Sequence, residues 1–355
     1  MVKIPVFKKC LNVDSNTMKK NRIKSAFYIF TIFLTTQVFP QKNNPEDFGF
    51  RHMQTKYRGE TIDILIKSKI GEELKQKPIF LFCQGSLPQP LFKKDGDKTY
   101  SVFPFKTDSL EIDYHIVIIS KPLIPLVVEA KSLGRNFVYE DPKTGKIPKE
   151  YSNRNILDYY VERNLKVIDY LEKLPFVDNS KLVLAGHSEG STIAAKLALK
   201  CKRVTKLIYA SGCPLGRIMA MIGQDRATET DTDSTRYGES EFNYWEQVVN
   251  DKSNMDDING DTYKATYEFS IPPIQYLEKL TIPVLICYGT KDWSAPYNDY
   301  LRVEMFRQKK KNFTFKAYIG LDHNFFPLTT NGQPNYEIFN WDIVANEWWK
   351  WTKQK

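Results

Sequence analysis

The fold of this chain is decided by Lys181-Leu-Val-Leu-Ala-Gly-His-Ser-Glu-Gly-Ser-Thr-Ile-Ala-Ala-Lys-Leu-Ala-Leu199. The first residues are apolar or small, as a strand buried on both faces requires, and a helical pattern begins at Ser191. Between them stands Gly-x-Ser-x-Gly. A nucleophilic serine needs a turn tight enough to raise its hydroxyl above a sheet, and a side chain at either flanking glycine would collide with a neighbouring element. We therefore predict that Ser188 is a nucleophile.

A carboxylate that could support such a serine follows a later strand. The apolar run 283–289 ends in Gly289-x-x-Asp292. In a parallel sheet this places the carboxylate just beyond the carboxyl end of a strand, on the rim that the serine also occupies. Asp292 is therefore the predicted acid, whereas Asp322 adjoins the candidate base and cannot easily turn back to its ring.

The base is chosen from only four histidines. His52 precedes the predicted sheet, His115 lies inside a predicted strand, and His187 lies in the turn itself, where successive side chains diverge. The fourth, His323, follows the predicted strand 313–319 in a loop at the same rim. It is the predicted general base.

The order Ser188, Asp292, His323 resembles that of the α/β-hydrolase superfamily of serine hydrolases. The resemblance implies an α/β fold with a mostly parallel central sheet flanked by helices and with a helical cap insertion. It also implies an oxyanion hole. By this resemblance the backbone N–H groups of Glu189 and of Ser86, which follows Gln84-Gly85 at the end of a predicted strand, donate to the oxyanion. Gln84 stands where such enzymes commonly have histidine.

Apolar patterning predicts the remaining elements of a hydrolase domain over residues 42–355. Residues 42–60 read as a polar surface lead-in, and neither 87–110 nor 121–153 predicts a regular element. Helices are expected at the end of the chain and before the Ser188 strand. The predicted strands are 61–67, 78–83, 114–120, 181–186, 206–212, 283–289 and 313–319, and the predicted helices are 154–174 and 336–351.

An insertion of about 65 residues, roughly 213–278, separates two of these strands and is too long for a bare loop. We expect helices over 241–250 and 263–279. By the resemblance the insertion forms a cap or lid over the active site. Its aromatic and methionine side chains either line a substrate pocket or form the lid's own small core. The substrate-binding candidates are Met219, Tyr237 and Trp245.

The amino-terminal residues read as an export signal. Residues 1–41 hold seven Lys or Arg against one acidic residue, so they carry +6 of the net charge of +9 and leave about +3 for the rest. A basic segment beginning at Met18, which we predict to be the start, precedes an apolar run over 26–39. This run is shorter than the roughly 20 residues that span a bilayer, so we expect cleavage, no stable membrane anchor and a periplasmic or secreted protein. A retained anchor is the alternative.

These observations predict an exported serine hydrolase that cleaves a carboxylic ester on a small-molecule or peptide acyl substrate. The body of the chain is not strongly basic, which argues against nucleic-acid binding. No cofactor is needed for the chemistry, and no Cys/His spacing suggests a metal site; Cys83, Cys201, Cys213 and Cys287 are expected to be unpaired buried thiols. The open alternatives are an acylaminoacyl or dipeptidyl-type peptidase, a thioesterase, and a non-catalytic binding protein with the same fold.

Overall fold

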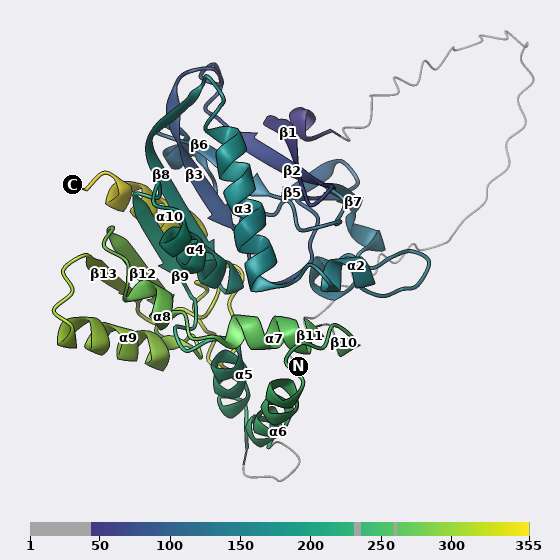
Figure 1. Ribbon diagram of the computed structural model, residues 1–355, viewed down its shortest axis with the longest axis vertical. Helices are drawn as coiled ribbons and strands as arrows, with labels where there is room; N and C mark the ends of the chain where they lie inside the picture. Colours follow the sequence, from purple (N-terminus) through teal and green to yellow (C-terminus); the bar gives the residue numbers. More distant parts are fainter. Residues whose placement is uncertain (1–43, 231–235, 259–260, 355) are drawn as a thin grey trace, which may run out of the picture. The chain divides into compact units, whose positions relative to one another are not determined.

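The computed structural model describes residues 44–230, 236–258 and 261–354, which belong to one compact unit, Lys42–Lys355 (Figure 1). The predicted signal segment 1–41, with Met18, lies outside the described residues. Within these residues, no helix combines the length and apolar character needed to cross a membrane.

An eight-stranded sheet forms the centre of the unit, with the strand order β1-β2-β6-β3-β8-β9-β12-β13. β1 and β2 pair antiparallel, as do β2 and β6, and all other neighbours are parallel. The carboxyl ends of the parallel strands therefore share one rim. The strands are β1 (Phe50–Tyr57), β2 (Glu60–Lys67), β3 (Lys77–Cys83), β6 (His115–Ile119), β8 (Val177–His187), β9 (Lys206–Ala210), β12 (Val284–Gly289) and β13 (Phe313–Tyr318).

Each central strand is apolar on both faces because helices cover both sides of the sheet. In β3, Ile79 and Leu81 face the core under α3 and α4, whereas Phe80 and Phe82 face the aromatic core under α10. Figure 1 shows α3 and α4 in front of the strands and α10 behind them. The flanking helices are α1 (Asp108–Glu111), α3 (Leu157–Leu171), α4 (Glu189–Lys200), α8 (Ile274–Leu277), α9 (Ala295–Arg307) and α10 (Trp341–Thr352).

The insertion between β9 and β12 is helical. It contains α5 (Arg217–Arg226), α6 (Tyr237–Asn250) and α7 (Tyr263–Ser270), with a short hairpin of β10 (Asp257–Ile258) and β11 (Asp261–Thr262), and α5 packs on both α6 and α7. The single helix expected over 263–279 is two helices. Pro272 and Pro273 supply no N–H, and the first disfavours helical geometry at Ile271, so α7 ends before them and α8 begins after them.

Three expectations about irregular segments are corrected. Residues 42–60 contain the edge strand β1, whose mostly polar, half-exposed side chains conceal its pairing with β2. The segments 87–110 and 121–153 also contain regular structure. They include a three-stranded sheet of β4 (Phe92–Asp95), β5 (Lys98–Ser101) and β7 (Val127–Glu129), the helices α1 and α2 (Lys149–Ser152), and short 3₁₀ turns at Ala130–Ser132 and Arg135–Phe137; another such turn, Pro45–Phe48, precedes β1.

The four cysteines of the described chain are buried free thiols, which confirms the expectation that they do not pair. Burial raises the pKa of Cys83, Cys213 and Cys287 to about 12. They are therefore small core side chains and not thiolates at neutral pH.

Candidate active site

Ser188 stands on a strained turn between β8 and α4. Its φ of 57° and ψ of −127° lie in a region that L-residues seldom occupy, and its N–H donates to the Ala210 carbonyl at 3.0 Å. A Cβ atom at Gly186 would overlap the backbone of Gly190, and a Cβ atom at Gly190 would overlap the carbonyl of Cys83. Both glycines are thus required by close backbone approach, as the sequence pattern predicts.

The structure brings the three predicted triad side chains together. His323 Nε2 lies 3.0 Å from Ser188 Oγ, and His323 Nδ1 lies 2.9 Å from Asp292 Oδ2. Asp292 is buried, and its other oxygen accepts a hydrogen bond from the Ser294 N–H at 2.9 Å, which fixes the plane of the carboxylate. With Asp292 ionised, the Nδ1 proton is held on the acid side and Nε2 is left to accept the serine proton.

Two loops at the ends of β12 and β13 hold this geometry. A Cβ atom at Gly289 would overlap the carbonyls of Leu321 and Asp322, and the Lys291 N–H donates to Leu321 O at 2.8 Å. Asp322, the rival acid, instead turns into its own loop, where Oδ1 accepts the N–H groups of Asn324 and Phe326 at 2.9 and 2.7 Å. Asp322 therefore shapes the loop that carries the histidine.

Two further rings contact the imidazole of His323. The indole of Trp293 stacks on it with a centroid distance of 4.4 Å and an angle of 20°, and the ring of His187 lies 5.1 Å away. His187 Nε2 is 2.9 Å from the carbonyl of His323, and burial, reinforced by His323, lowers the pKa of His187 to about 3. A neutral His187 with its proton on Nε2 therefore donates to the His323 backbone and is not itself a base near neutral pH.

The segment predicted to complete an oxyanion hole lies beside the nucleophile. A Cβ atom at Gly85 would lie 3.8 Å from Ser188 Cβ, and both Ser86 and Glu189 line the same cleft as Ser188. The carbonyl of Ser86 accepts a hydrogen bond from the Tyr151 hydroxyl at 3.2 Å. Gln84, in the position where histidine is commoner, turns inward and donates through Nε2 to Ile119 O at 2.9 Å.

A cleft of about 940 Å³ opens above Ser188 between the sheet and the insertion. Arg217, Gln224 and Asp261 contribute polar groups to it. Its apolar lining comes from both the hydrolase body and the insertion and is rich in aromatic rings: Phe82, Leu87, Val102, Pro104, Phe137, Ala220, Met221, Phe269, Trp293, Phe326, Phe339 and Trp341.

The three predicted substrate-binding residues are not among the residues that line this cleft. Tyr237 is 51% exposed at the start of α6, and Trp245 stacks on Tyr267 with a centroid distance of 5.9 Å. Met219 is half-buried on α5. On α5 it is Ala220 and Met221 that line the cleft. Trp245 packs on another residue of the insertion, Tyr267, as expected for a side chain of the lid's own core.

Buried charges surround Glu189, the residue after the nucleophile. Arg217 of α5 forms ion pairs with both Glu189 and Asp261, and Lys121 Nζ lies 3.9 Å from Glu189 Oε1. Burial lowers the pKa of Lys121 to about 8, with the charge of Glu189 opposing the shift. Burial also raises the pKa of Asp261, and Arg217 opposes that shift. The two cations and two anions balance when all four are ionised.

Sequence reasoning missed Trp293, Arg217 and the supporting role of His187. Trp293 directly follows Asp292, so its adjacency to the predicted acid is the one signal available. Arg217 lies in a helix with no clear apolar period, and nothing in the local sequence pairs it with Glu189.

The other two histidines, His52 and His115, are held by hydrogen bonds away from the triad. His115 is bound by Ser68 Oγ at 2.7 Å, and His52 by Asp63 at 2.8 Å. Within the described residues, no group of three or more His, Cys, Asp or Glu side chains is arranged to hold a metal ion.

Comparisons with known proteins agree with this architecture. A family model described as an alpha/beta hydrolase fold matches residues 158–327. No curated protein sequence matches the chain. Among solved structures, Est1E from Butyrivibrio proteoclasticus with bound ferulic acid aligns at 17% identity and a TM-score of 0.52, covering 84% of this chain and 97% of that one.

Two peptidase structures align with only part of their length. The acylaminoacyl peptidase of Pyrococcus horikoshii aligns at 14% identity and a TM-score of 0.51 over 85% of this chain and 41% of that one. A putative dipeptidyl aminopeptidase IV from Bacteroides ovatus aligns at 11% identity and a TM-score of 0.51 over 86% and 36%. Identities this low establish the fold alone. Together with the strand order, the elbow at Ser188 and the family model, they show that this chain has the α/β-hydrolase fold.

Proposed function

We propose that this protein is an exported serine hydrolase that cleaves carboxylic esters through an acyl-enzyme. The observation that carries the proposal is the unbroken chain of hydrogen-bonding contacts Ser188 Oγ to His323 Nε2, at 3.0 Å, and His323 Nδ1 to Asp292 Oδ2, at 2.9 Å. A serine hydroxyl is a weak nucleophile by itself, and this arrangement is the one that activates it.

The proposed reaction begins when Ser188 Oγ attacks the acyl carbon and its proton passes to His323 Nε2. Asp292 stabilises the imidazolium that forms. The N–H groups of Ser86 and Glu189 hold the oxyanion of the tetrahedral intermediate. His323 then gives the proton to the departing alcohol, leaving an acyl-Ser188 ester. Water, deprotonated by His323, attacks that ester and regenerates the serine.

The cleft favours an ester with an apolar or aromatic part. Its aromatic walls, among them Phe137, Phe269 and Phe339, bury apolar surface, whereas the lid charges Arg217 and Asp261 are already paired with each other and leave little capacity to bind a charged group. The structure of Est1E was solved with ferulic acid bound, and the alignment covers 97% of that chain and 84% of this one. An aromatic carboxylic ester is therefore the first substrate class to test.

The direct test measures intact mass after treatment with a fluorophosphonate. We expect one adduct on the wild-type protein, none on Ser188→Ala and a much slower reaction for His323→Ala. An adduct that persists in Ser188→Ala would refute the assignment of the nucleophile. A folded wild-type protein that forms no adduct and hydrolyses nothing would favour the non-catalytic alternative.

Substrate class is then decided by rate ratios. Matched ester, thioester and amide compounds with one aromatic acyl group are compared by kcat/KM, with Ser188→Ala as the blank. A preference for the ester supports the proposal, and faster cleavage of N-acylated peptides would replace it with the peptidase alternative.

Export is tested separately by sequencing the amino terminus of the protein recovered outside the cytoplasm. We expect cleavage between about Thr36 and Gln41. A terminus that retains residues 26–39 would mean an anchored protein.

A further inference from the structure

A ring of largely buried polar contacts joins the two proposed oxyanion-hole residues to the insertion. The ring passes through Tyr151, Asn155, Asp261, Arg217, Glu189, Lys121 and Tyr160 and returns to Tyr151, and Ser86 is attached to it through its carbonyl, which lies 3.2 Å from the Tyr151 hydroxyl. Arg217 and Asp261 belong to the insertion, and the other members belong to the hydrolase body.

The first part of this network runs from Ser86 to the insertion. The Tyr151 hydroxyl lies 3.2 Å from both the Ser86 carbonyl and Asn155 Oδ1 and 3.4 Å from the Tyr160 hydroxyl, so when its single proton is donated to Ser86 its oxygen can still accept the proton of Tyr160. Asn155 Nδ2 donates to Asp261 Oδ1 at 2.7 Å. Tyr151 and Asn155 are buried, so these bonds are shielded from competing water.

The second half runs from the insertion to the residue after the nucleophile. Arg217 Nη1 donates to Asp261 Oδ2 at 2.9 Å, and its Nη2 donates to Glu189 Oε2. The guanidinium also lies 4.5 Å from the ring centre of Phe269 on α7. Arg217 therefore bridges a carboxylate of the insertion and a carboxylate of the body through two different nitrogens of its planar guanidinium.

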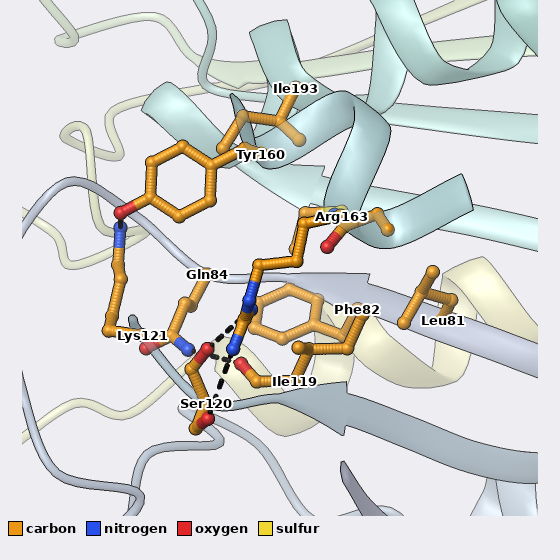
Figure 2. Close-up of a pocket in the computed structure, with 11 residues that line it drawn as sticks. Leu81, Phe82, Gln84, Ile119, Ser120, Lys121, Tyr160, Arg163 and Ile193 are labelled. Carbon is orange, nitrogen blue, oxygen red and sulfur yellow. Dashed lines mark hydrogen bonds between the residues drawn. The ribbon is translucent and has the colours of Figure 1, made fainter. Parts of the chain in front are cut away.

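Lys121 closes the ring beneath the proposed oxyanion loop. Figure 2 shows its side chain reaching the hydroxyl of Tyr160, and the measured distance is 3.4 Å. The ammonium also lies 4.8 Å from the Tyr160 ring centre and 3.9 Å from Glu189 Oε1. Glu189 Oε1 has no hydrogen-bond partner within the described chain, so Arg217 alone binds this carboxylate by hydrogen bonds.

These contacts reach both residues whose N–H groups would face the oxyanion. Ser86 is held through its own carbonyl, and Glu189 through a side chain whose backbone begins α4. Donors of this kind stabilise the transition state only when their positions are fixed before reaction, and displacements of about 1 Å are costly. Arg217 and Asp261 can therefore influence the positions of Ser86 and Glu189 at the reacting centre without contacting the substrate.

We propose that Arg217 and Asp261 are positioning residues that fix the oxyanion hole, so that the insertion must be seated for Ser188 to react efficiently. This inference rests on the proposed hydrolase function. The positioning role adds to that function, because it gives the insertion an effect on the rate of the chemical step in addition to any contact with substrate.

The test uses p-nitrophenyl acetate, whose acetyl group is too small to need the walls of the insertion. We expect Arg217→Met to lower kcat by about 10- to 100-fold with little change in KM, because a full donor is worth about 100- to 1000-fold and here it is displaced and not removed. Arg217→Lys keeps the charge but replaces the two donor nitrogens of the guanidinium by one ammonium, so it should recover only part of the loss.

The matched control is Arg226→Met on the same helix. Arg226 is paired with Glu229 and Glu239, both within the insertion, so its loss should leave kcat unchanged. Tyr151→Phe is the second variant. It removes one hydroxyl and no charge, retains the buried ring, and should lower kcat by about 3- to 10-fold even if Arg217→Met fails to fold.

A trifluoromethyl ketone distinguishes positioning from a purely structural role. Its adduct with Ser188 carries an oxyanion in the hole, so its inhibition constant should rise in Arg217→Met and Tyr151→Phe in proportion to the loss of kcat/KM. Variants with wild-type kcat and ketone affinity, but a raised KM for long esters, would overturn the proposal and leave the insertion a substrate wall. If the wild type itself shows no Ser188-dependent hydrolysis, the failure lies in the proposed hydrolase function and not in the contacts of Arg217 and Asp261.

Discussion

The two sides of Ser188 are built in different ways. On one side, backbone turns at the ends of β8, β12 and β13 place the triad, and close glycine contacts allow those turns to approach one another. On the other side, side chains separated by up to 140 residues, from Lys121 to Asp261, meet in a buried ring. A site that local backbone turns build can be recognised from a sequence motif. A site built by side chains far apart in the sequence cannot.

The largest expected effect concerns the backbone-built side. Replacing Ser188 with Ala should lower kcat for the best ester by about 10⁴- to 10⁶-fold, because the covalent route is lost and only residual binding and oxyanion stabilisation remain. The measurement is a steady-state assay with active-site titration to exclude wild-type contamination. A loss below tenfold would mean that the reaction does not pass through this serine.

The elbow backbone itself is tested by Gly190→Ala. Its Cβ atom would overlap the carbonyls of Cys83 and Gln84, so β3 and α4 must separate, and we expect a loss of several kcal/mol in unfolding free energy together with the activity. Gly320→Ala is the matched control. Gly320 has a φ of 78° but no neighbour within 4 Å of its Cβ position, so only about 1 kcal/mol of backbone strain is expected. Equal losses from the two substitutions would show that close approach is not what selects Gly190.

His187 tests how firmly the histidine loop is held in acid. Its pKa of about 3 in the folded state lies below the ordinary value of 6.5, so between these values the unfolded state binds a proton that the folded state does not. Stability is therefore fully present above pH 6.5 and is lost as the pH falls, by about 1.4 kcal/mol per unit.

The measurement compares wild type and His187→Gln by urea unfolding at pH 7 and pH 5. The wild type should lose roughly 2 kcal/mol more than the variant over this interval. Equal slopes would show that burial does not lower the pKa of His187 in the folded protein, and would contradict its assignment as a neutral imidazole.

The smallest effect is expected on the outer surface of the insertion. Tyr237 is 51% exposed and does not line the cleft, so Tyr237→Ala should change kcat/KM less than twofold for esters of any length. Met221→Ala, on the cleft wall, is the comparison and should lower kcat/KM for long or aromatic esters severalfold. A larger effect at Tyr237 would bring back the pocket assignment made from the sequence.

The features that could be predicted from the sequence are those set by local patterns, and the features that could not are set by tertiary contacts. The elbow, the acid after β12 and the histidine after β13 were predictable because each is a local pattern at a strand end, and their chain order limits how they can meet. The strand β1 was missed because an edge strand buries only one face. Met219 on α5 and Tyr237 and Trp245 on α6 do not line the cleft, because which sides of these two helices face Ser188 depends on how α5 packs against α6 and α7. The pairing of Arg217 with Glu189 follows only from the tertiary fold.

The buried ring also bears on protein engineering. Because Glu189 lies next to the nucleophile and takes its hydrogen bonds from Arg217, exchanging residues 213–278 for the insertion of another enzyme would leave this carboxylate without a hydrogen-bond donor and with only Lys121, 3.9 Å away, as a neighbouring cation. Removing one partner of a buried ion pair costs about 3–5 kcal/mol, so we expect such a chimera to lose stability before substrate choice is affected. Grafts onto this scaffold should therefore carry an arginine and an acidic residue in equivalent places, or replace Glu189 by a neutral side chain at the same time.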